Sequence, residues 1–188
     1  MHLKEKFDRL MELDEYARKL GCTQTCLLLA REINIDERIR MKCFTNSCQQ
    51  YNKNLMCPPL LPSLEEIRRV LDKYTFALLI MFQHSCSIEN WKNEFDKAGI
   101  WMNETVLKLE KKAFSLGFYM SLGLGSGECK LCDVCAAKEG SRFCNRPGEA
   151  RPSVEGMGID VSRLCREADL PMDFVPGELS AVGLLLID

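Results

Sequence analysis

Cysteine spacing is the feature of this sequence that points most directly to chemistry. Cys129, Cys132 and Cys135 are separated by two residues each, and Cys144 follows after a gap of eight, just before Arg146-Pro147. Three thiolates at this spacing let one loop wrap three corners of a cubane, while a more distant cysteine serves the fourth iron. Tetrahedral zinc sites more often join two separated Cys-x-x-Cys pairs. The pattern therefore predicts a [4Fe-4S] cluster at these four cysteines, with zinc as the alternative.

A second group consists of Cys43, Cys48 and Cys57, the last of which directly precedes Pro58-Pro59. A proline after a ligating cysteine fixes the backbone and removes a competing donor, and ferredoxin ligand runs likewise end in Cys-Pro. This group predicts a second metal centre or cluster. Three thiolates leave one position open, which either a distant cysteine fills or a water or substrate occupies. The alternative is that the three thiols only pack, because free cysteine is often buried.

Four further cysteines lie outside both groups, and each is expected to pack in the interior: Cys22, Cys26, Cys86 and Cys165. The first three also remain open as a fourth ligand of the second group. The only histidines, His2 and His84, are remote from both groups. A mixed Cys/His zinc site therefore has little to draw on, and no Ser-His or Cys-His catalytic pair is indicated. No catalytic residue is assigned.

Residues around the first group suit an anionic cluster. Gly123, Gly125 and Gly127 precede the first cysteine and are expected to let backbone amides approach sulfur, which is one way to set a cluster's potential. Four basic side chains are candidates for offsetting thiolate charge, with solvated surface as the alternative: Lys130, Arg142, Arg146 and Arg151.

Composition narrows the function classes. The net charge is -2, with 25 basic and 27 acidic residues interspersed, so neither nucleic acid nor an anionic membrane is an expected partner. The N-terminus lacks a signal-peptide core, and the longest apolar run, residues 76–82, is too short for a bilayer span. These features predict a cytoplasmic protein. In a reducing compartment, 11 cysteines are better explained by metal ligation than by disulfides.

Hydrophobic periodicity and capping signals predict an α/β or α+β fold with a small mixed sheet, flanking helices and cysteine-rich metal-binding loops. One domain spanning residues 1–188 is expected, with cysteine-rich segments at 43–59 and 123–152. The expected helices are residues 2–20, 64–74, 89–115 with a candidate break at Ala98-Gly99, and 161–168; the expected strands are residues 26–33, 38–44, 76–82, 118–124 and 182–187.

Several motifs resemble a family of predicted metal-binding proteins from bacteria and archaea, the domain of unknown function 2284. The matching stretches include Arg40-Met-Lys-Cys43, Asn54-Leu-Met-Cys57-Pro-Pro, Gly123-Leu-Gly-Ser-Gly-Glu-Cys129-Lys-Leu-Cys132 and Ala150-Arg-Pro-Ser-Val-Glu-Gly-Met-Gly-Ile-Asp160-Val. The resemblance spans nearly the whole chain and implies that the seven grouped cysteines are metal ligands; it implies no reaction. One departure is Asn52, where the family pattern often has glycine. The other four cysteines match no family cysteine, which agrees with packing.

The sequence therefore predicts an iron-sulfur protein with one or two [4Fe-4S] clusters that passes electrons to a redox partner protein. Two other functions stay open. One is an enzyme that uses an open-coordination [4Fe-4S] cluster on a small molecule, and the other is a zinc-stabilised interaction module.

Overall fold

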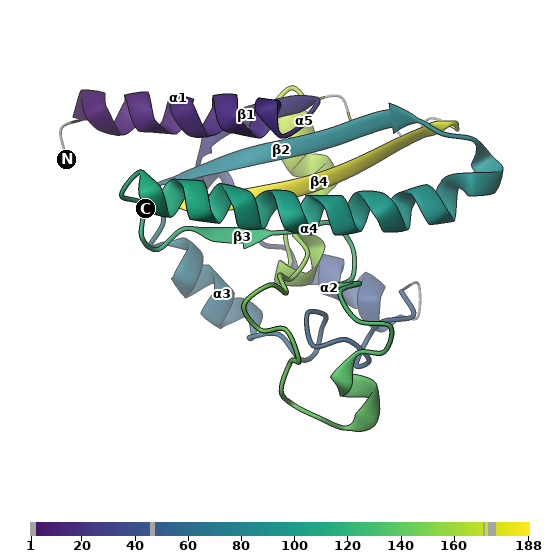
Figure 1. The fold of residues 1–188 in the computed structure, drawn as a ribbon. Helices are drawn as coiled ribbons and strands as arrows, with labels where there is room; N and C mark the ends of the chain where they lie inside the picture. The colour runs from purple at the N-terminus through teal and green to yellow at the C-terminus, as the bar shows by residue number, and fades with distance from the viewer. Residues whose placement is uncertain (1–2, 46–47, 171, 173–175) are drawn as a thin grey trace.

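A single antiparallel sheet organises the protein. A computed structural model describes residues 3–45, 48–170, 172 and 176–188 (Figure 1). The strands are β1 (Gln24–Leu29), β2 (Phe76–Ser85), β3 (Leu122–Leu124) and β4 (Glu178–Ile187), in the order β1-β2-β4-β3. All three strand pairings are antiparallel. The predicted combination of a small sheet with flanking helices is confirmed, but the described strands pair antiparallel and not in the mixed arrangement that was predicted.

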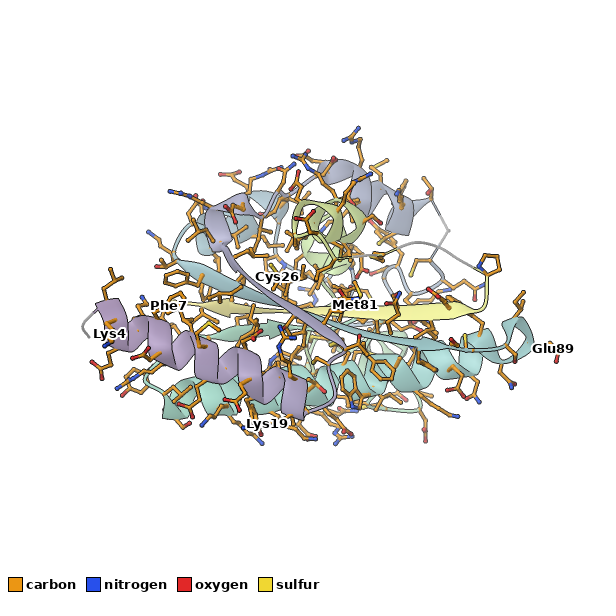
Figure 2. The ribbon with its side chains drawn as sticks, turned by 90° about the horizontal axis from the view of Figure 1, so that it is seen from above. Lys4, Phe7, Lys19, Cys26, Met81 and Glu89 are labelled. Atoms are coloured by element: carbon orange, nitrogen blue, oxygen red, sulfur yellow. The ribbon has the colours of Figure 1, made fainter. Side chains whose placement is uncertain are left out.

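Both faces of the sheet are apolar and both are covered. Leu78 and Ile80 of β2 face a core formed with α1 (Leu3–Lys19) and α4 (Trp91–Ser115). Leu79 and Met81, the intervening residues, face a core on the opposite side of the sheet. Figure 2 shows the long helices on one side of the sheet and the remaining helices on the other.

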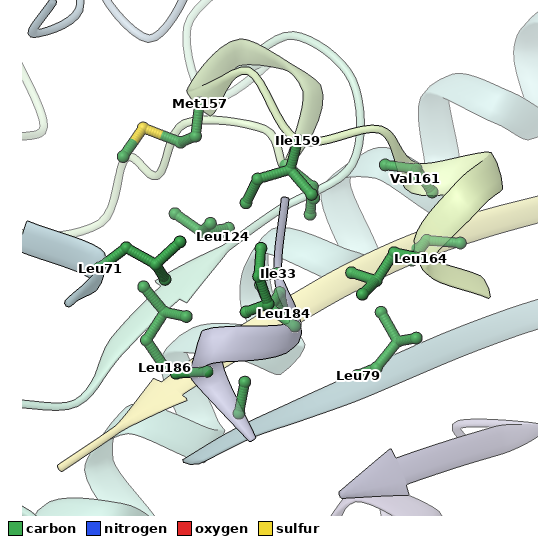
Figure 3. Packing of buried hydrophobic residues seen from close by; sticks show 14 of the residues in the cluster. Ile33, Leu71, Leu79, Leu124, Met157, Ile159, Val161, Leu164, Leu184 and Leu186 are labelled. Carbon is green, nitrogen blue, oxygen red and sulfur yellow. The ribbon is translucent and has the colours of Figure 1, made fainter. Parts of the chain in front are cut away.

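The second core carries the shorter elements. It is covered by α3 (Leu64–Leu71), α5 (Val161–Glu167) and a 3-10 turn at Glu155–Met157. Figure 3 shows Ile159 and Leu164 above Leu79 and Leu184 of the sheet. The helix α2 (Glu37–Phe44) packs beside the 3-10 turn. The cysteine-rich segment that contains Cys43 begins on α2 beside this layer.

Several predicted elements are confirmed. The helix α1 confirms the predicted helix at residues 2–20 but ends at Lys19, one residue earlier, and His2 lies outside the described residues. The capping box at the start of α3 forms, because Ser63 Oγ accepts from the Glu66 amide and Glu66 accepts from the Ser63 amide. Asp160 caps α5 as predicted. The helix α4 runs without a break through the candidate position at Ala98-Gly99.

The predicted strand at residues 38–44 is wrong, because these residues form α2. Asp36 is the N-cap of this helix, and its carboxylate accepts a hydrogen bond from the Arg38 amide. The apparent alternation of apolar residues does not correspond to burial, since Ile39 is buried while Met41 is 53% exposed. Two other strands are shorter than predicted. β1 ends at Leu29, before a 3-10 turn, and β3 covers only the last three residues of the predicted range 118–124.

No helix in the described part of the chain is long and apolar enough to cross a membrane.

The close approach of α4 to the sheet depends on Gly183 in β4. A Cβ atom at this position would lie 2.6 Å from Met102 Sδ and 3.1 Å from the Leu124 carbonyl oxygen. We therefore expect Gly183→Ala to lower the free energy of unfolding by about 1–3 kcal/mol, because added atoms in a close-packed core force neighbours to shift. Anaerobic urea denaturation measures the change. Gly148→Ala is the control, since a Cβ there meets nothing within 4 Å; an equal effect of both substitutions would contradict this packing.

Candidate metal centre

The four cysteines of the first group lie around one cavity. Cys129, Cys132, Cys135 and Cys144 all line it, together with residues 54–56 from the other cysteine-rich segment. Its volume is about 20 Å³, which is room for roughly one water molecule. Figure 1 shows both segments below the sheet in that view, past the edge strand β3. The structure therefore brings together four thiols that are spread over 16 residues of sequence.

Asn54 joins the two cysteine-rich segments. Its side chain is only 3% exposed. The Nδ2 atom donates to the Cys129 carbonyl oxygen at 2.8 Å, and Oδ1 accepts from the Met56 amide at 3.0 Å. The neighbouring Leu55 amide donates to Cys135 Sγ at 3.4 Å. The buried side chain of Asn54 thus fixes the turn before Cys57 against the loop that carries the first group.

Backbone amides point at several of the sulfur atoms. Besides the Leu55 amide on Cys135, the Arg146 amide donates to Cys144 Sγ at 3.3 Å, and the Leu131 backbone donates to Cys129. The glycine amides play a different role from the one expected. The Gly123 amide donates to the Glu110 carboxylate and the Gly125 amide to the Pro152 carbonyl oxygen. Amide donation to sulfur is therefore present, but from residues other than Gly123 and Gly125.

The long helix α4 anchors the chain that follows Cys144. Buried Asn103 donates through Nδ2 to the Glu149 carbonyl oxygen at 3.0 Å, and its Oδ1 accepts from the Arg151 amide at 3.2 Å. About two helical turns after Asn103, Glu110 forms an ion pair with Arg151. The Glu110 side chain is 14% exposed and the Arg151 side chain 17%. A half-buried pair of this kind is held by two parallel hydrogen bonds. Arg151 therefore ties the loop to α4 twice, through its backbone amide to Asn103 and through its side chain to Glu110.

The basic residues near the first group pair with carboxylates. Lys130 lies 3.2 Å from Glu128 and 3.4 Å from Asp96. Arg146 pairs with Glu149, and Arg151 pairs with Glu110 as described above. Arg142 is exposed. Three of the four cations named as candidates for offsetting thiolate charge are thus paired with carboxylates, whereas backbone amides donate to the sulfur atoms of Cys135 and Cys144.

The three cysteines of the second group do not all line one cavity. Cys43 on α2 and Cys48 line a cavity of about 410 Å³. Cys57 does not line it and is 7% exposed. Burial raises the pKa of Cys57 to about 12, and charge on Cys48, Cys43 and Cys129 acts in the same direction. Cys57 therefore lies within electrostatic range of both cysteine groups. Residues 46–47, between Cys43 and Cys48, lie outside the described residues.

Arg40 connects the segments around the second group. It precedes Cys43 by three residues on α2, and its guanidinium donates to the Gly156 and Pro62 carbonyl oxygens, both at 2.9 Å. Its third nitrogen, Nη2, is buried without a hydrogen-bond partner. Burial lowers the pKa of Arg40, and charge on Cys43 opposes this shift. A buried cation with an unused donor beside a thiol suits an anionic metal-thiolate group.

The other four cysteines pack in the two cores. Cys165 and Cys26 belong to the core beneath α5, whereas Cys22 and Cys86 belong to the core beneath α1 and α4. All eleven cysteines are among the described residues, and all are free thiols. Within the described ranges, no three His, Cys, Asp or Glu side chains are grouped closely enough to hold one metal ion.

Sequence reasoning missed several residues that hold the cysteines in place. Asn54 and Arg40 fall inside the stretches that carry the family resemblance, so their positions were a signal. Asn103 and Glu110 lie in a long amphipathic helix, where nothing in the sequence separates them from solvated polar residues. Asn52 adopts a φ of 58°, the left-handed region that asparagine tolerates better than most residues, which explains how it replaces the family's glycine.

The Asn54 contact generates a stability prediction. We expect Asn54→Ala to lower the free energy of unfolding by about 1–3 kcal/mol, because it leaves the Cys129 carbonyl and the Met56 amide without their buried partner. Urea denaturation of the anaerobic, reduced protein measures the loss. Asn93→Ala on the exposed side of α4 is the matched control and should change stability by less than about 0.5 kcal/mol. Equal values for the two variants would show that Asn54 is not a structural link.

Comparison with known proteins gives one match. A family model described as a predicted metal-binding protein, domain of unknown function 2284, matches residues 26–187. No curated protein and no solved structure matches the chain. The matched region contains both cysteine groups and every side chain described above as holding them. The chain belongs to the domain of unknown function 2284 family of predicted metal-binding proteins.

Proposed function

We propose that the protein is an iron-sulfur electron-transfer protein whose [4Fe-4S] cluster is bound by Cys129, Cys132, Cys135 and Cys144. The observation that carries this proposal is the single cavity lined by all four thiols. A cubane takes one thiolate at each iron, so its ligands surround a space instead of converging on one ion. This requirement is compatible with the absence of a single-ion group among the described residues.

The protein groups around this cavity suit a redox role. A bound cluster supplies one-electron chemistry, and hydrogen bonds to sulfur are one determinant of its reduction potential. The Leu55 and Arg146 amides donate to Cys135 and Cys144. Such donors favour the more negatively charged, reduced state, because they stabilise charge on sulfur. The chain thus contributes thiolate ligands and a fixed set of donors that adjust the potential.

A redox partner protein would need access to this loop. Two large apolar side chains on it are exposed, Val134 at 51% and Phe143 at 83%. They are the sequence neighbours of Cys135 and Cys144. Exposed apolar residues beside a redox centre are what a transient docking surface requires, since interface centres are apolar while their rims are polar. This supports electron exchange with another protein at the first centre.

We propose a second metal centre or cluster at Cys43, Cys48 and Cys57. The unused Nη2 donor of Arg40 beside Cys43 supports an anionic group there. A second function is favoured by the cavity of about 410 Å³ that Cys43 and Cys48 line, because an enzyme working at an open iron needs room for a small molecule. A zinc-stabilised interaction module remains the alternative that metal analysis must separate from both.

Metal and sulfide content test the first centre. Anaerobically purified protein is expected to be coloured and to contain iron and acid-labile sulfide in equal amounts. Cys132→Ala should lower the iron and sulfide content by as many as about four atoms of each per chain, because one corner iron loses its protein ligand and the cubane is held less firmly. Cys86→Ala is the matched control, since Cys86 packs in the opposite core, and it should retain both. Colourless protein with zinc and no sulfide would contradict the proposal.

The position of Cys57 generates a spectroscopic prediction. Because the Leu55 amide, two residues before Cys57, donates to Cys135 Sγ at 3.4 Å, two reduced clusters at the two groups would be close neighbours. Electron paramagnetic resonance of fully reduced protein is expected to show signals split or broadened by interacting spins. Cys57→Ala should leave the unbroadened signal of the first cluster alone. Two independent signals, or a single signal unchanged by Cys57→Ala, would argue against paired clusters.

A further inference from the structure

The cavity beside Cys43 and Cys48 has features that metal binding does not explain. Its volume of about 410 Å³ falls in the range of small-molecule sites, roughly 300–1,000 Å³. It lies between α2, the first turns of α4 and the beginning of α5. An electron carrier that docks a partner at its cluster needs no cavity of this size. The composition of its wall therefore indicates what it holds.

Glu155 places an unused carboxylate oxygen in this wall. Its Oε2 atom is inaccessible to solvent and has no hydrogen-bond partner. The residue is held rigidly, because the Gly156 amide donates to Ser153 Oγ at 3.0 Å and the Gly156 carbonyl accepts from Arg40 at 2.9 Å. Burial raises the pKa of Glu155, while a hydrogen bond with Ser153 opposes the shift. A buried carboxylate oxygen without a donor is costly unless a ligand supplies one.

The charges of the wall favour a cation. Among the described residues that line the cavity, three carry carboxylates, Glu155, Asp160 and Glu178, and one carries an amine, Lys42. Asp160 already accepts from the Arg163 amide as the cap of α5, and exposed Glu178 accepts from Gln83 Nε2 at 3.5 Å. Glu155 Oε2 is thus the carboxylate oxygen in the wall that is both buried and available.

The rest of the wall suits an apolar body. Trp91 and Phe95 on the first turns of α4 are stacked, with ring centroids 5.1 Å apart and planes 12° apart. Ile159 and Val182 add aliphatic surface. Lys130 Nζ already lies over the Phe95 ring, 5.5 Å from its centroid, so Trp91 is the ring with a face left for an aromatic group or a cation. The cavity combines three carboxylates, one of which has a buried oxygen without a hydrogen-bond partner, with a mostly apolar lining, and a few polar groups on an apolar wall are the usual composition of a small-molecule site.

We propose that this cavity binds a small protonated organic amine, with its ammonium group on Glu155 Oε2 and its apolar or aromatic body against Trp91 and Phe95. This site goes beyond electron transfer and does not require iron at Cys43 and Cys48. A metal-ligand role for Glu155 is the competing explanation, because the residue shares the cavity wall with both thiols. If Glu155 is a metal ligand, removing its carboxylate should lower the metal content. If Glu155 binds the amine, the metal content should not change.

Three probes of similar shape test the ligand class on the natural protein. Isothermal titration calorimetry of anaerobically purified protein compares 2-phenylethylamine, 2-phenylethanol and phenylacetate. The amine should bind saturably. The alcohol should bind at least about tenfold more weakly, because it lacks the charged hydrogen bond to Glu155, and the acid should show no binding, because its carboxylate is repelled by Glu155. Equal binding of amine and acid, or no saturable binding of the amine, would overturn the proposal.

Matched variants then locate the site. Glu155→Gln should weaken amine binding at least about tenfold, whereas Glu178→Gln, with the same charge change in the same wall, should alter it less than about twofold. Iron and sulfide are counted on every sample. Loss of metal with Glu155→Gln would assign Glu155 to the metal and overturn the amine site. If the protein is colourless but binds the amine, the proposed cluster is wrong and the amine site stands. If the protein contains iron but does not bind the amine, the amine site is wrong and the proposed cluster stands.

Discussion

Burial of both faces of β2 and β4 is the constraint from which the arrangement of this protein follows. Each strand presents large aliphatic side chains in both directions, so the sheet is stable only between two layers. Two long helices suffice for one face. The other face is covered by short helices and turns, and the chain between them is free to form loops. The second cysteine group begins on α2 beside this second layer, whereas the loop of the first group is tied to α4, so each group has a rigid base.

Irregular loops need specific polar contacts to hold ligands in place, and here those contacts are buried. Asn54 and Asn103 each satisfy backbone groups of a cysteine-rich segment, and the Glu110–Arg151 pair joins that segment to α4. Each such contact contributes modestly when formed but costs more when one partner is removed, because the other is left desolvated. The helix α4 therefore has two roles. One face packs on the sheet, and its polar residues fix the loop that bears the first group.

Sequence reasoning succeeded where one local signal determines one local structure. The capping box at Ser63 and the apolar run from Phe76 both form as predicted. The prediction of a strand at residues 38–44 failed, because alternating apolar residues over so short a stretch also occur in helices. The N-cap at Asp36, which indicates a helix, was not considered. The gathering of the four thiols around one cavity follows from spacing within one loop, which sequence reveals. The roles of Asn103 and Glu155 depend on contacts between distant segments, which sequence spacing does not encode.

The central claim is that the first cysteine group binds iron and sulfide together. X-ray absorption at the iron edge of anaerobically purified protein tests it most directly, because it reports the atoms around the metal. The account predicts a shell of sulfur and a second, short iron-iron shell, with about four fewer irons per chain in Cys132→Ala, where only the second group can still hold a cluster. No iron edge, together with a zinc edge whose only shell is sulfur at about 2.3 Å, would contradict it.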